Sequence, residues 1–389
     1  MSALLPTYRP ADLAFERGEG AYLYAAAGRR YLDFGSGIAV TALGHSHPKL
    51  VAALTEQGAK LWHCSNLYRI PGQERLAERL VANSFADHAF FCNSGAEAVE
   101  CGIKMVRKHH DATGHPERYR IICAENAFHG RTLATISAGG QPKHTEGFEP
   151  LVDGFDHVPF GNLNELRMAI TPKTGGILIE PVQGEGGIVA ADPQYIRGLR
   201  AVADEFGLLL FFDEVQTGMG RSGKLFAHEI YGVTPDIMAL AKGLGGGFPI
   251  GACLATENAA AGMTAGTHGS TFGGNPLAMA VANAVLDVML EDGFLAHVAE
   301  AAESLRGKLD RIAASYPSVV KDVRGVGLLI GLHCAVPNAD LQAALRNKGL
   351  LTVLGGGNVV RLLPPLTIGE SEIAEACAII EETCAALAA

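Results

Sequence analysis

Long hydrophobic runs are missing from this sequence. No apolar stretch approaches the roughly 20 residues that a membrane-spanning helix needs. The first ten residues, MSALLPTYRP, lack the charged segment followed by an apolar segment that marks a secretory signal. The sequence therefore argues against a membrane protein and a secreted protein, and we expect a cytoplasmic one.

An excess of basic residues is also missing. The 389 residues include 31 Lys and Arg against 41 Asp and Glu, which gives a net charge of -10. Binding to nucleic acid or to a membrane surface needs a basic face, and the sequence has no cluster of Lys or Arg to supply one. With 48% hydrophobic and 19% charged residues, the composition is that of a soluble globular enzyme.

Paired cysteines and clustered metal ligands are scarce. The eight cysteines are scattered without a C-x-x-C, so disulfides and a structural zinc site are both disfavoured. The nearest approaches to metal ligands are His45 with His47 and His109 with His110. The first pair lies in a turn bounded by Gly and Pro, with no carboxylate or third His near it in the sequence. We expect no metal.

The chain is long enough for about two domains. Residues 13–34 alternate apolar and polar side chains, which is typical of antiparallel hairpins. Pro48 and Pro71 each open a helical pattern, over 48–61 and 71–83, as proline does at a first helical position. From Ala89 strand and helix patterns alternate, which predicts an α/β fold with a mostly parallel sheet wrapped by helices.

The C-terminal third has a different pattern. Helical patterns dominate from about residue 275, followed by strand-like runs at 325–333, 350–355 and 358–363 and a last helix over 370–388. We predict an N-terminal flap over 1–47 that is part of the small domain. A large domain over 48–275 and a smaller α+β domain over 276–389 complete the chain.

Two chemical groups follow buried strand patterns in the large domain. The apolar run from Leu208 to Phe212 ends in Asp213, and about 30 residues later Ile237–Ala241 delivers Lys242 into a glycine-rich turn. Ligands bind outside the carboxyl ends of such strands, so both side chains are expected to face one pocket. They form either a structural ion pair or the two sides of a bound cofactor.

Two further segments have the spacing of phosphate-binding motifs. Ser94 and Glu97 are spaced as a capping box at a helix start, and small residues there leave amide N–H groups open to a phosphate. The alternative is simply a well-capped helix. Residues 218–223 match G-x-G-x-x-G, but five residues separate them from the strand, which disfavours a dinucleotide site.

Seven segments together resemble the class III pyridoxal-phosphate aminotransferases, in order and over nearly the whole chain. They are FFCNSGAEA (90–98), FHGRT (128–132), EPVQGEGG (180–187), FFDEVQTGMGRSG (211–223), PDIMALAKGLGGGFPIG (235–251), GTHGSTFGGNP (266–276) and RLLPPL (361–366). The resemblance implies the fold type I architecture, with a seven-stranded sheet in the large domain. It also implies pyridoxal 5'-phosphate as cofactor and a homodimer with shared active sites.

The resemblance assigns the cofactor contacts. Lys242 is expected to form an imine with the cofactor, which a buried amine of lowered pKa permits, and then to carry protons. Asp213 would keep the ring nitrogen protonated, so that the cofactor accepts electrons. The remaining contacts are Phe128 and Val215 on the ring faces, Gln216 on the phenolic oxygen, Gly95 and Ala96 on the phosphate, and Thr271 on the phosphate of the neighbouring subunit's cofactor.

The resemblance also assigns the substrate contacts. Arg131 and Arg361 would bind carboxylates, because a guanidinium fork matches a carboxylate bidentately. Glu185 would pair with Arg361 while the amino donor reacts and release it for 2-oxoglutarate. Ser270 would reach the neighbouring subunit's substrate.

The identity of the donor depends on fewer residues. Ile38 stands where ornithine aminotransferases carry a tyrosine, and an apolar residue suits an acylated α-amine. We therefore expect N-acetylornithine. Ornithine, succinylornithine, N-succinyl-diaminopimelate and 4-aminobutyrate are the alternatives within the family. A non-catalytic cofactor carrier, and a racemase or decarboxylase, are the alternatives outside this activity.

Overall fold

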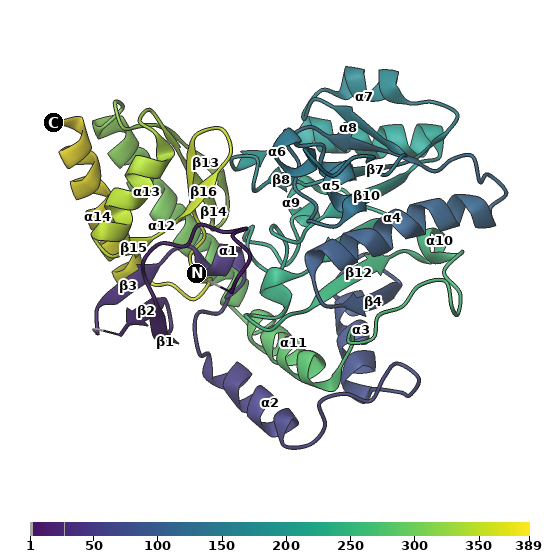
Figure 1. Ribbon diagram of the computed structural model, residues 1–389, viewed down its shortest axis with the longest axis horizontal. Helices are drawn as coiled ribbons and strands as arrows, with labels where there is room; N and C mark the ends of the chain where they lie inside the picture. Colours follow the sequence, from purple (N-terminus) through teal and green to yellow (C-terminus); the bar gives the residue numbers. More distant parts are fainter. Residues whose placement is uncertain (1–2, 27) are drawn as a thin grey trace.

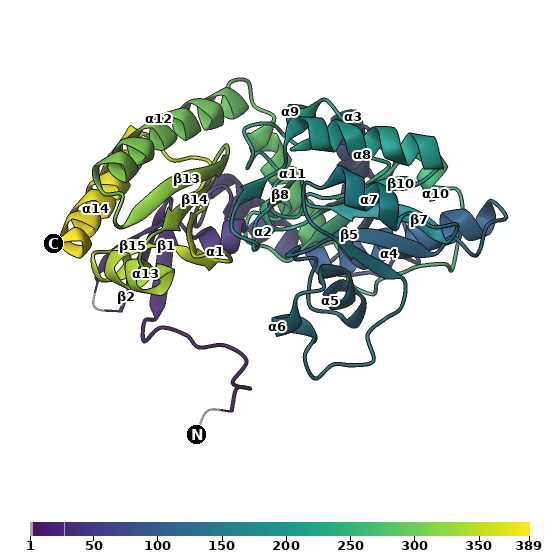
Figure 2. The same ribbon diagram turned by 90° about the horizontal axis from the view of Figure 1, so that it is seen from above.

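The computed structural model describes residues 3–26 and 28–389, so the predicted flap over 1–47 lies outside the described residues at positions 1, 2 and 27. Figure 1 shows two lobes. One is built on a large sheet, and the other contains most of the C-terminal third of the chain together with the N-terminal strands. Figure 2 shows the same two lobes from above, with the segment from residue 3 to residue 14 extending away from both.

The large lobe is organised around a seven-stranded sheet in the order β4-β12-β11-β10-β7-β5-β6. All strands run parallel except β12, which is antiparallel to both of its neighbours. The connection from β11 to β12 contains no helix crossover, which a parallel pair would need. The predicted α/β fold with a mostly parallel sheet is confirmed. The strands are β4 (His88–Cys92), β5 (Arg120–Ala124), β6 (Phe155–Val158), β7 (Thr174–Ile179), β10 (Leu209–Asp213), β11 (Ile237–Leu240) and β12 (Gly251–Ala255).

The central strand β10 is buried on both faces, as its continuous apolar sequence predicts. Phe211 packs with α4 (Gly95–Ala112) on one face, and Phe212 packs with α8 (Pro193–Phe206) on the other. Gly102 allows α4 to lie directly on the sheet, since a Cβ there would be 2.3 Å from the Phe211 ring. The strand therefore delivers Asp213 into the crevice at the carboxyl edge of the sheet.

Shorter helices complete the two layers of the large lobe. α5 contacts α4 and the strands β5 and β6, while α7 and α9 contact α8. These helices and the remaining short ones are α5 (Leu133–Gly139), α6 (Pro142–Thr145), α7 (Leu163–Ala169), α9 (His228–Tyr231), α10 (Glu257–Ala260) and η1 (Lys242–Leu244).

Three helices that begin at proline form the base of the molecule in Figure 1. They are α2 (Pro48–Gly58), α3 (Pro71–Ala82) and α11 (Pro276–Met289). The predicted starts at Pro48 and Pro71 are confirmed, and the helices end at Gly58 and Ala82 rather than at 61 and 83. α11 contacts α2 and α3, and also α12 (Phe294–Ser315) of the other lobe. The division of the chain at residues 47 and 275 stays a prediction.

The small lobe combines an antiparallel sheet in the order β13-β14-β17-β16 with the last three long helices. α14 begins and ends where the sequence predicts, at Glu370 and Ala388. The elements are α12 (Phe294–Ser315), β13 (Val320–Val326), β14 (Leu329–Cys334), α13 (Asn338–Asn347), β16 (Val353–Gly355), β17 (Val359–Leu362) and α14 (Glu370–Ala388).

The run 325–333, expected to be one strand, is instead the end of β13, a turn and the strand β14. The apolar residues continue through the turn, so the sequence pattern does not mark it. Gly327 makes the turn with a φ of +58°, and a Cβ there would lie 2.4 Å from the backbone carbon of Ser222. A close approach between the two lobes thus fixes the turn.

The N-terminal strands form the predicted antiparallel hairpins and then join the C-terminal part of the chain. β1 (Phe15–Glu19), β2 (Tyr22–Ala25) and β3 (Arg30–Asp33) pair in order, and β3 pairs in parallel with β15 (Leu350–Leu351). The flap is therefore hydrogen-bonded to a strand of the C-terminal third.

The segment that follows β3 is strained. All four residues of α1 (Ser36–Ala39) have positive φ, between 47° and 69°, so this turn is left-handed. A left-handed helical conformation costs an L-residue roughly 1–2 kcal/mol, and Ile38 is also β-branched. Only Gly37 adopts it without that cost. Contacts elsewhere must hold this turn in place.

Three negative findings apply to the residues that the structure describes. None of their helices is both long and apolar enough to cross a membrane. They contain no group of three or more His, Cys, Asp or Glu side chains arranged to hold a metal ion. All eight cysteines are free, and all except Cys64 are buried.

Candidate functional site

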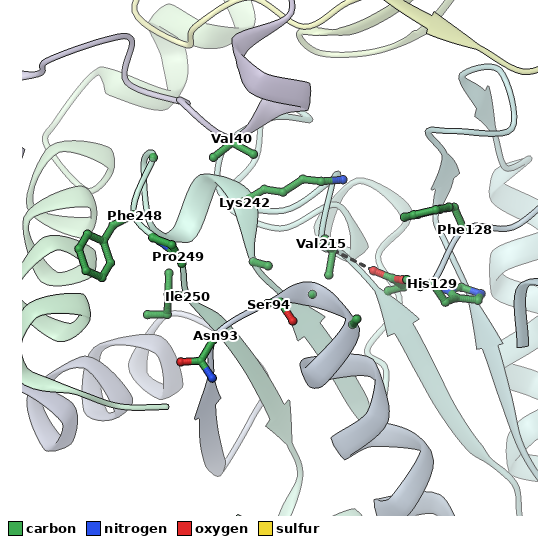
Figure 3. A pocket seen from close by; sticks show the side chains of 16 residues that line it. Val40, Asn93, Ser94, Phe128, His129, Val215, Lys242, Phe248, Pro249 and Ile250 are labelled. Carbon is green, nitrogen blue, oxygen red and sulfur yellow. Dashed lines mark hydrogen bonds and ion pairs between the residues drawn. The ribbon is translucent and has the colours of Figure 1, made fainter. Parts of the chain in front are cut away.

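A cavity of about 300 Å³ opens at the carboxyl ends of β10 and β11, beside the start of α4. This position agrees with the general rule for open α/β sheets, and the volume is at the lower end of the range for small-ligand sites. Figure 3 shows the side chains that converge on it. The lining residues are Val40, Asn93, Ser94, Gly95, Ala96, Phe128, His129, Gly130, Asp213, Val215, Ala241, Lys242, Gly247, Phe248, Pro249 and Ile250.

Lys242 enters the cavity from the 3-10 turn η1 that follows β11. Its side chain extends over Val215 in the direction of Phe128 (Figure 3). Burial lowers the pKa of the Lys242 amine from 10.5 to about 8, an effect that the Asp213 carboxylate opposes and the Arg361 guanidinium reinforces. A sizeable fraction of the amine is therefore neutral and nucleophilic near neutral pH.

Asp213 is buried at the end of β10, and both of its carboxylate oxygens are hydrogen-bonded. Oδ1 accepts from the Val215 N–H at 3.0 Å, and Oδ2 lies 2.8 Å from His129 Nδ1. Burial disfavours a charged His129, but the hydrogen bond and charge of Asp213, together with the charge of Glu180, outweigh it and raise the His129 pKa. Asp213 is thus held in one orientation beside the cavity.

Glu180 holds the backbone of Phe128 by hydrogen bonds. Its carboxylate accepts hydrogen bonds from the N–H groups of Phe128 at 3.0 Å and Gly184 at 3.3 Å. Burial raises the Glu180 pKa to about 7, although His129 acts in the opposite direction. Glu180 therefore fixes the backbone on which Phe128 enters the cavity.

The first turn of α4 faces the cavity with its backbone N–H groups. Ser94 caps the helix by accepting from the Glu97 N–H at 3.3 Å, while the Glu97 carboxylate accepts from Asn93 N rather than from Ser94 N. The N–H groups of Gly95 and Ala96 have no acceptor within the helix, as at every helix start. Their position at the positive end of a helix of 18 residues suits an anion.

Phe128, Val215 and Asp213 all line the cavity, and Figure 3 shows the Phe128 and Val215 side chains entering it from separate segments. Arg131, three residues after Phe128, is exposed, and its guanidinium carbon lies 5.7 Å from the centroid of the Phe128 ring. Arg131 does not line the cavity but is held near its rim by this cation–π contact.

Arg361 is a buried charged group near the site, with a side chain only 1% exposed. Its Nη2 donates to Glu185 Oε2 at 2.6 Å and to the Leu354 carbonyl at 2.8 Å, and its Nη1 donates to Gln216 Oε1 at 3.4 Å. Burial lowers the Arg361 pKa and Glu185 opposes that effect. The structure therefore places Glu185 against Arg361, the pairing that the resemblance implies, and adds Gln216, which the resemblance assigns only to the cofactor.

Glu185 lies at the tip of the hairpin formed by β8 (Val182–Gln183) and β9 (Val189–Ala190). The tip contacts the small lobe, since the Glu185 carbonyl accepts from Gly356 N at 2.8 Å. Gly187 allows this approach, because a Cβ there would lie 2.6 Å from the Gly356 oxygen. A segment of the large lobe thus meets the strand pair that carries Arg361.

Besides Arg131, Glu185, Gln216 and Arg361, three more predicted site residues do not line the cavity. Ile38 is 42% exposed and stands two residues before the cavity residue Val40. Thr271 is exposed, and Ser270 is half-buried beside Asn93, whose Nδ2 donates to its Oγ at 3.2 Å. Within this chain, Ser270 and Thr271 reach the surface next to the cavity rather than the cavity itself.

The sequence does not indicate that His129 and Glu180 belong to the site. Both lie inside segments that carry the resemblance, FHGRT and EPVQGEGG, so the motifs held the only available signal. Their contacts join residues 84 positions apart in the case of His129 and Asp213, and sequence spacing gives no indication of such a pair.

The arrangement fits pyridoxal phosphate. It combines a lysine of lowered pKa, a buried carboxylate held by a histidine, an aromatic ring and a valine in the same cavity wall, and a helix N-terminus that suits a phosphate. Gly95 permits the helix start to come this close, because a Cβ there would lie 2.8 Å from Val215 Cγ1.

Comparisons with known proteins agree with the geometry. The family model for aminotransferase class-III matches residues 5–384. The acetylornithine aminotransferase of Mesorhizobium japonicum is 63% identical over 96% of this chain and 94% of its own length.

Two solved structures share the fold. The ornithine aminotransferase of Toxoplasma gondii superposes with a TM-score of 0.95 at 30% identity, covering 99% of this chain and 93% of its own. The N-acetylornithine aminotransferase of Stenotrophomonas maltophilia gives a TM-score of 0.85 at 38% identity, covering 97% of each chain. The chain therefore belongs to the class III aminotransferases, enzymes of fold type I that transfer amino groups with pyridoxal 5'-phosphate.

Proposed function

We propose that this enzyme transfers the ω-amino group of N2-acetyl-L-ornithine to 2-oxoglutarate, giving N-acetyl-L-glutamate 5-semialdehyde and L-glutamate. The 63% identity to a relative named acetylornithine aminotransferase supports this donor over ornithine, because the solved ornithine aminotransferase is only 30% identical. Ile38, where ornithine aminotransferases carry a tyrosine, supports the same choice. The reaction belongs to arginine biosynthesis, and a cytoplasmic location is part of the proposal.

Lys242 and Asp213 are the proposed catalytic residues. Lys242 binds the cofactor through its amine and moves a proton to and from the reacting carbon, a role supported by its lowered pKa inside the cavity. When bound, pyridoxal phosphate supplies an electron sink for the charge left on the substrate carbon as its proton leaves. Asp213 keeps the ring nitrogen protonated, and His129 positions Asp213 through the 2.8 Å contact.

Four of the remaining proposed cofactor contacts line the cavity, and Gln216 does not. Gly95 and Ala96 hold the phosphate with their backbone N–H groups, and Phe128 and Val215 hold the two ring faces. Gln216 donates to the phenolic oxygen with its side-chain amide. Its Oε1 accepts from Arg361, which leaves Nε2 as the donor for this contact.

Glu185 and Arg361 let one pocket serve two substrates. The single observation that carries this part is the 2.6 Å ion pair, in which a guanidinium buried to 1% exposure is neutralised by a Glu185 side chain that is 28% exposed. Pairing hides the positive charge from the donor's α-carboxylate, which then lies on Arg131. The dicarboxylate acceptor displaces Glu185 because it engages Arg131 as well.

A homodimer with shared active sites is the proposed assembly. Four large apolar side chains from the segments around residues 62–68 and 272 are at least 60% exposed, namely Trp62, Leu67, Tyr68 and Phe272. Their two segments are joined, because Asn66 Nδ2 donates to the carbonyls of Ser270 at 3.2 Å and Gly273 at 2.8 Å. Such a patch favours covering by a second copy. Ser270 and Thr271 would then contact that copy's substrate and phosphate.

The test separates the two half-reactions in single turnovers followed by the absorbance of the bound cofactor. In the wild-type enzyme N-acetylornithine should convert the cofactor to its amine form, and 2-oxoglutarate should restore it. Glu185→Ala should raise reactivity toward glutamate relative to N-acetylornithine, since Arg361 is unmasked. Arg361→Ala should impair the 2-oxoglutarate half-reaction and spare the donor half.

Two results would contradict the proposal. Equal slowing of both half-reactions by Glu185→Ala would make Glu185 a structural partner of the hairpin β8–β9. A cofactor spectrum that glutamate, N-acetylornithine and the alternative amines all leave unchanged would favour a non-catalytic carrier.

A further inference from the structure

The left-handed turn α1 (Ser36–Ala39) is held by a buried carboxylate. Asp33 Oδ1 accepts from the N–H groups of Gly35 and Ser36, both at 2.9 Å, and so fixes the entry to the turn. Asp33 Oδ2 lies 2.8 Å from His45 Nε2, across the far end of the same loop. Asp33 is 3% exposed, so both interactions are shielded from water. A carboxylate thus does accompany His45, although the sequence places none nearby.

His45 is itself fixed by the flap. Its backbone pairs with Gly20 in both directions, with N–O distances of 3.0 and 2.8 Å. Gly18 leaves room for the ring, since a Cβ at that position would lie 2.6 Å from His45 Cβ. The loop from Asp33 to His45 is therefore closed at both ends, and the strained turn lies between them.

The turn lies where the two lobes meet at the cavity. α1 contacts η1, the turn that carries Lys242, and the next residue, Val40, lines the cavity. Figure 3 shows α1 directly above the cavity with Val40 pointing toward it. Ala39 packs with Val359 and Leu363, which flank Arg361 in sequence. Strain of this kind is characteristic of functional sites.

We propose that Asp33 and His45 are positioning residues that hold this turn against its own strain, so that Val40 stays fixed in the cavity wall and Ile38 stays at the rim beside it, giving the donor side a rigid apolar surface. The inference rests on the proposed function and specifies how its donor is selected. An apolar wall offers no hydrogen-bond acceptor to a free α-ammonium group, whereas it accommodates an acylated nitrogen beside alkyl groups. A relaxed turn would lose this discrimination.

The first experiment compares His45→Ala with His45→Gln in steady-state kinetics. His45→Ala removes the donor to Asp33 and should raise the KM for N-acetylornithine severalfold with a much smaller effect on kcat. It should also reduce the preference for N-acetylornithine over ornithine, and it should leave the KM for 2-oxoglutarate unchanged. His45→Gln retains an N–H donor and should restore most of the preference.

A purely structural role predicts something different. In that case all KM values and kcat change together, or the thermal midpoint falls with no change in donor preference. Either result, or the same preference in both His45 variants, would overturn the proposal.

The second experiment measures the strain itself by thermal unfolding. At an ordinary helical position alanine is favoured over glycine, but at the left-handed Ile38 glycine avoids the Cβ clash. Ile38→Gly should therefore unfold at a temperature at least as high as that of Ile38→Ala. The matched pair is Leu54→Gly and Leu54→Ala in α2, at another exposed apolar residue, where the alanine variant should be the more stable. The same order at both positions would contradict a left-handed turn.

The experiments distinguish a wrong donor from a wrong role for Asp33 and His45. An enzyme that turns over ornithine or 4-aminobutyrate and not N-acetylornithine would overturn the donor alone. The His45 comparison on the amine that is turned over, and the Ile38 pair, would still decide whether the turn selects the donor.

Discussion

The side chain of Lys242 combines two properties that seldom occur together in a lysine. Burial lowers its pKa to about 8, and its charged neighbours include both an anion and a cation, so the pKa is not raised as in a simple ion pair. A protonated lysine in a plain salt bridge is a poor nucleophile. The arrangement at Lys242 leaves the amine available at the pH of the cell.

The capture of pyridoxal phosphate by the apoenzyme should depend on pH with a midpoint near 8 rather than near 10.5. The neutral amine reacts, so the rate should rise as the pH rises through the pKa. Asp213→Asn removes an anion that favours the ammonium form, and it should shift the midpoint downward. The measurement is the rate of the absorbance change after mixing. Pyridoxamine phosphate lacks the aldehyde, so its binding serves as the control and should not follow this curve.

Asp213→Asn should also separate binding from catalysis. The amide has the size of the carboxylate but cannot hold a proton on the cofactor ring electrostatically. We expect bound cofactor to be retained and kcat to fall by on the order of 10²-fold or more. Steady-state kinetics at saturating cofactor, with the bound fraction measured by absorbance, test this. A kcat near that of the wild type would count decisively against the electron-sink role.

Residues of the candidate site could be predicted from the sequence where a buried apolar run ends in a charged residue. Asp213 and Lys242 follow such runs, and the structure brings them to one cavity. His129 could not be found in this way, because its partner Asp213 is 84 positions away. The hydrogen bond from Arg361 to the Leu354 carbonyl also escapes the sequence, since a backbone acceptor leaves no trace in residue type.

At the scale of elements, the start of α4 depends on the absence of a side chain at Gly95. Gly95→Ala would place a Cβ 2.8 Å from Val215 Cγ1 and 3.0 Å from Cγ2, so the helix or Val215 must shift. Overpacking of this kind costs about 1–3 kcal/mol, and it also displaces the N–H groups proposed for the phosphate. We expect weaker cofactor binding and a lower thermal midpoint.

Gly307→Ala in α12 is the matched control, because a Cβ there meets only Arg311 Nη1 at 4.0 Å. Replacing a helical glycine with alanine should raise stability by about 0.5–1 kcal/mol. Cofactor titrations and thermal unfolding of both variants make the comparison. Equal behaviour of the two variants would show that packing against Val215 has no part in the site.

Elements with strong local signals could be predicted, and elements set by contacts between lobes could not. Proline marks the starts of α2 and α3, and alternation marks the N-terminal hairpins. The turn at Gly327 lies inside an apolar run and is fixed by the backbone of Ser222. The left-handed α1 contains one glycine among four residues, so its sequence does not indicate the conformation that Asp33 and His45 hold.

In the whole molecule, the proposed homodimer needs residues from two chains to complete each active site. Lys242→Ala removes the amine of one chain, and Thr271→Asp places a negative charge where we expect the partner's phosphate. Each variant alone should be inactive. After the two are mixed and subunits exchange, half the dimers are mixed and each has one intact site, so about a quarter of the wild-type activity should return.

Activity of the mixture and its mass by light scattering are the two readouts. Full activity of Thr271→Asp alone, or a monomeric wild-type enzyme, would contradict the shared site. A mixture that stays inactive although its subunits have exchanged would also contradict the shared site.

The central claim is that Lys242 is the amine through which the cofactor is held. Reduction of the loaded enzyme with borohydride fixes the cofactor on the amine that carries it, and peptide mapping by mass spectrometry then identifies the residue. We predict one modified peptide, the one that contains Lys242, and no modification after prior conversion by an amino donor. Modification of a different lysine, such as Lys224 or Lys104, or an unmodified Lys242 in fully loaded enzyme, would contradict the account.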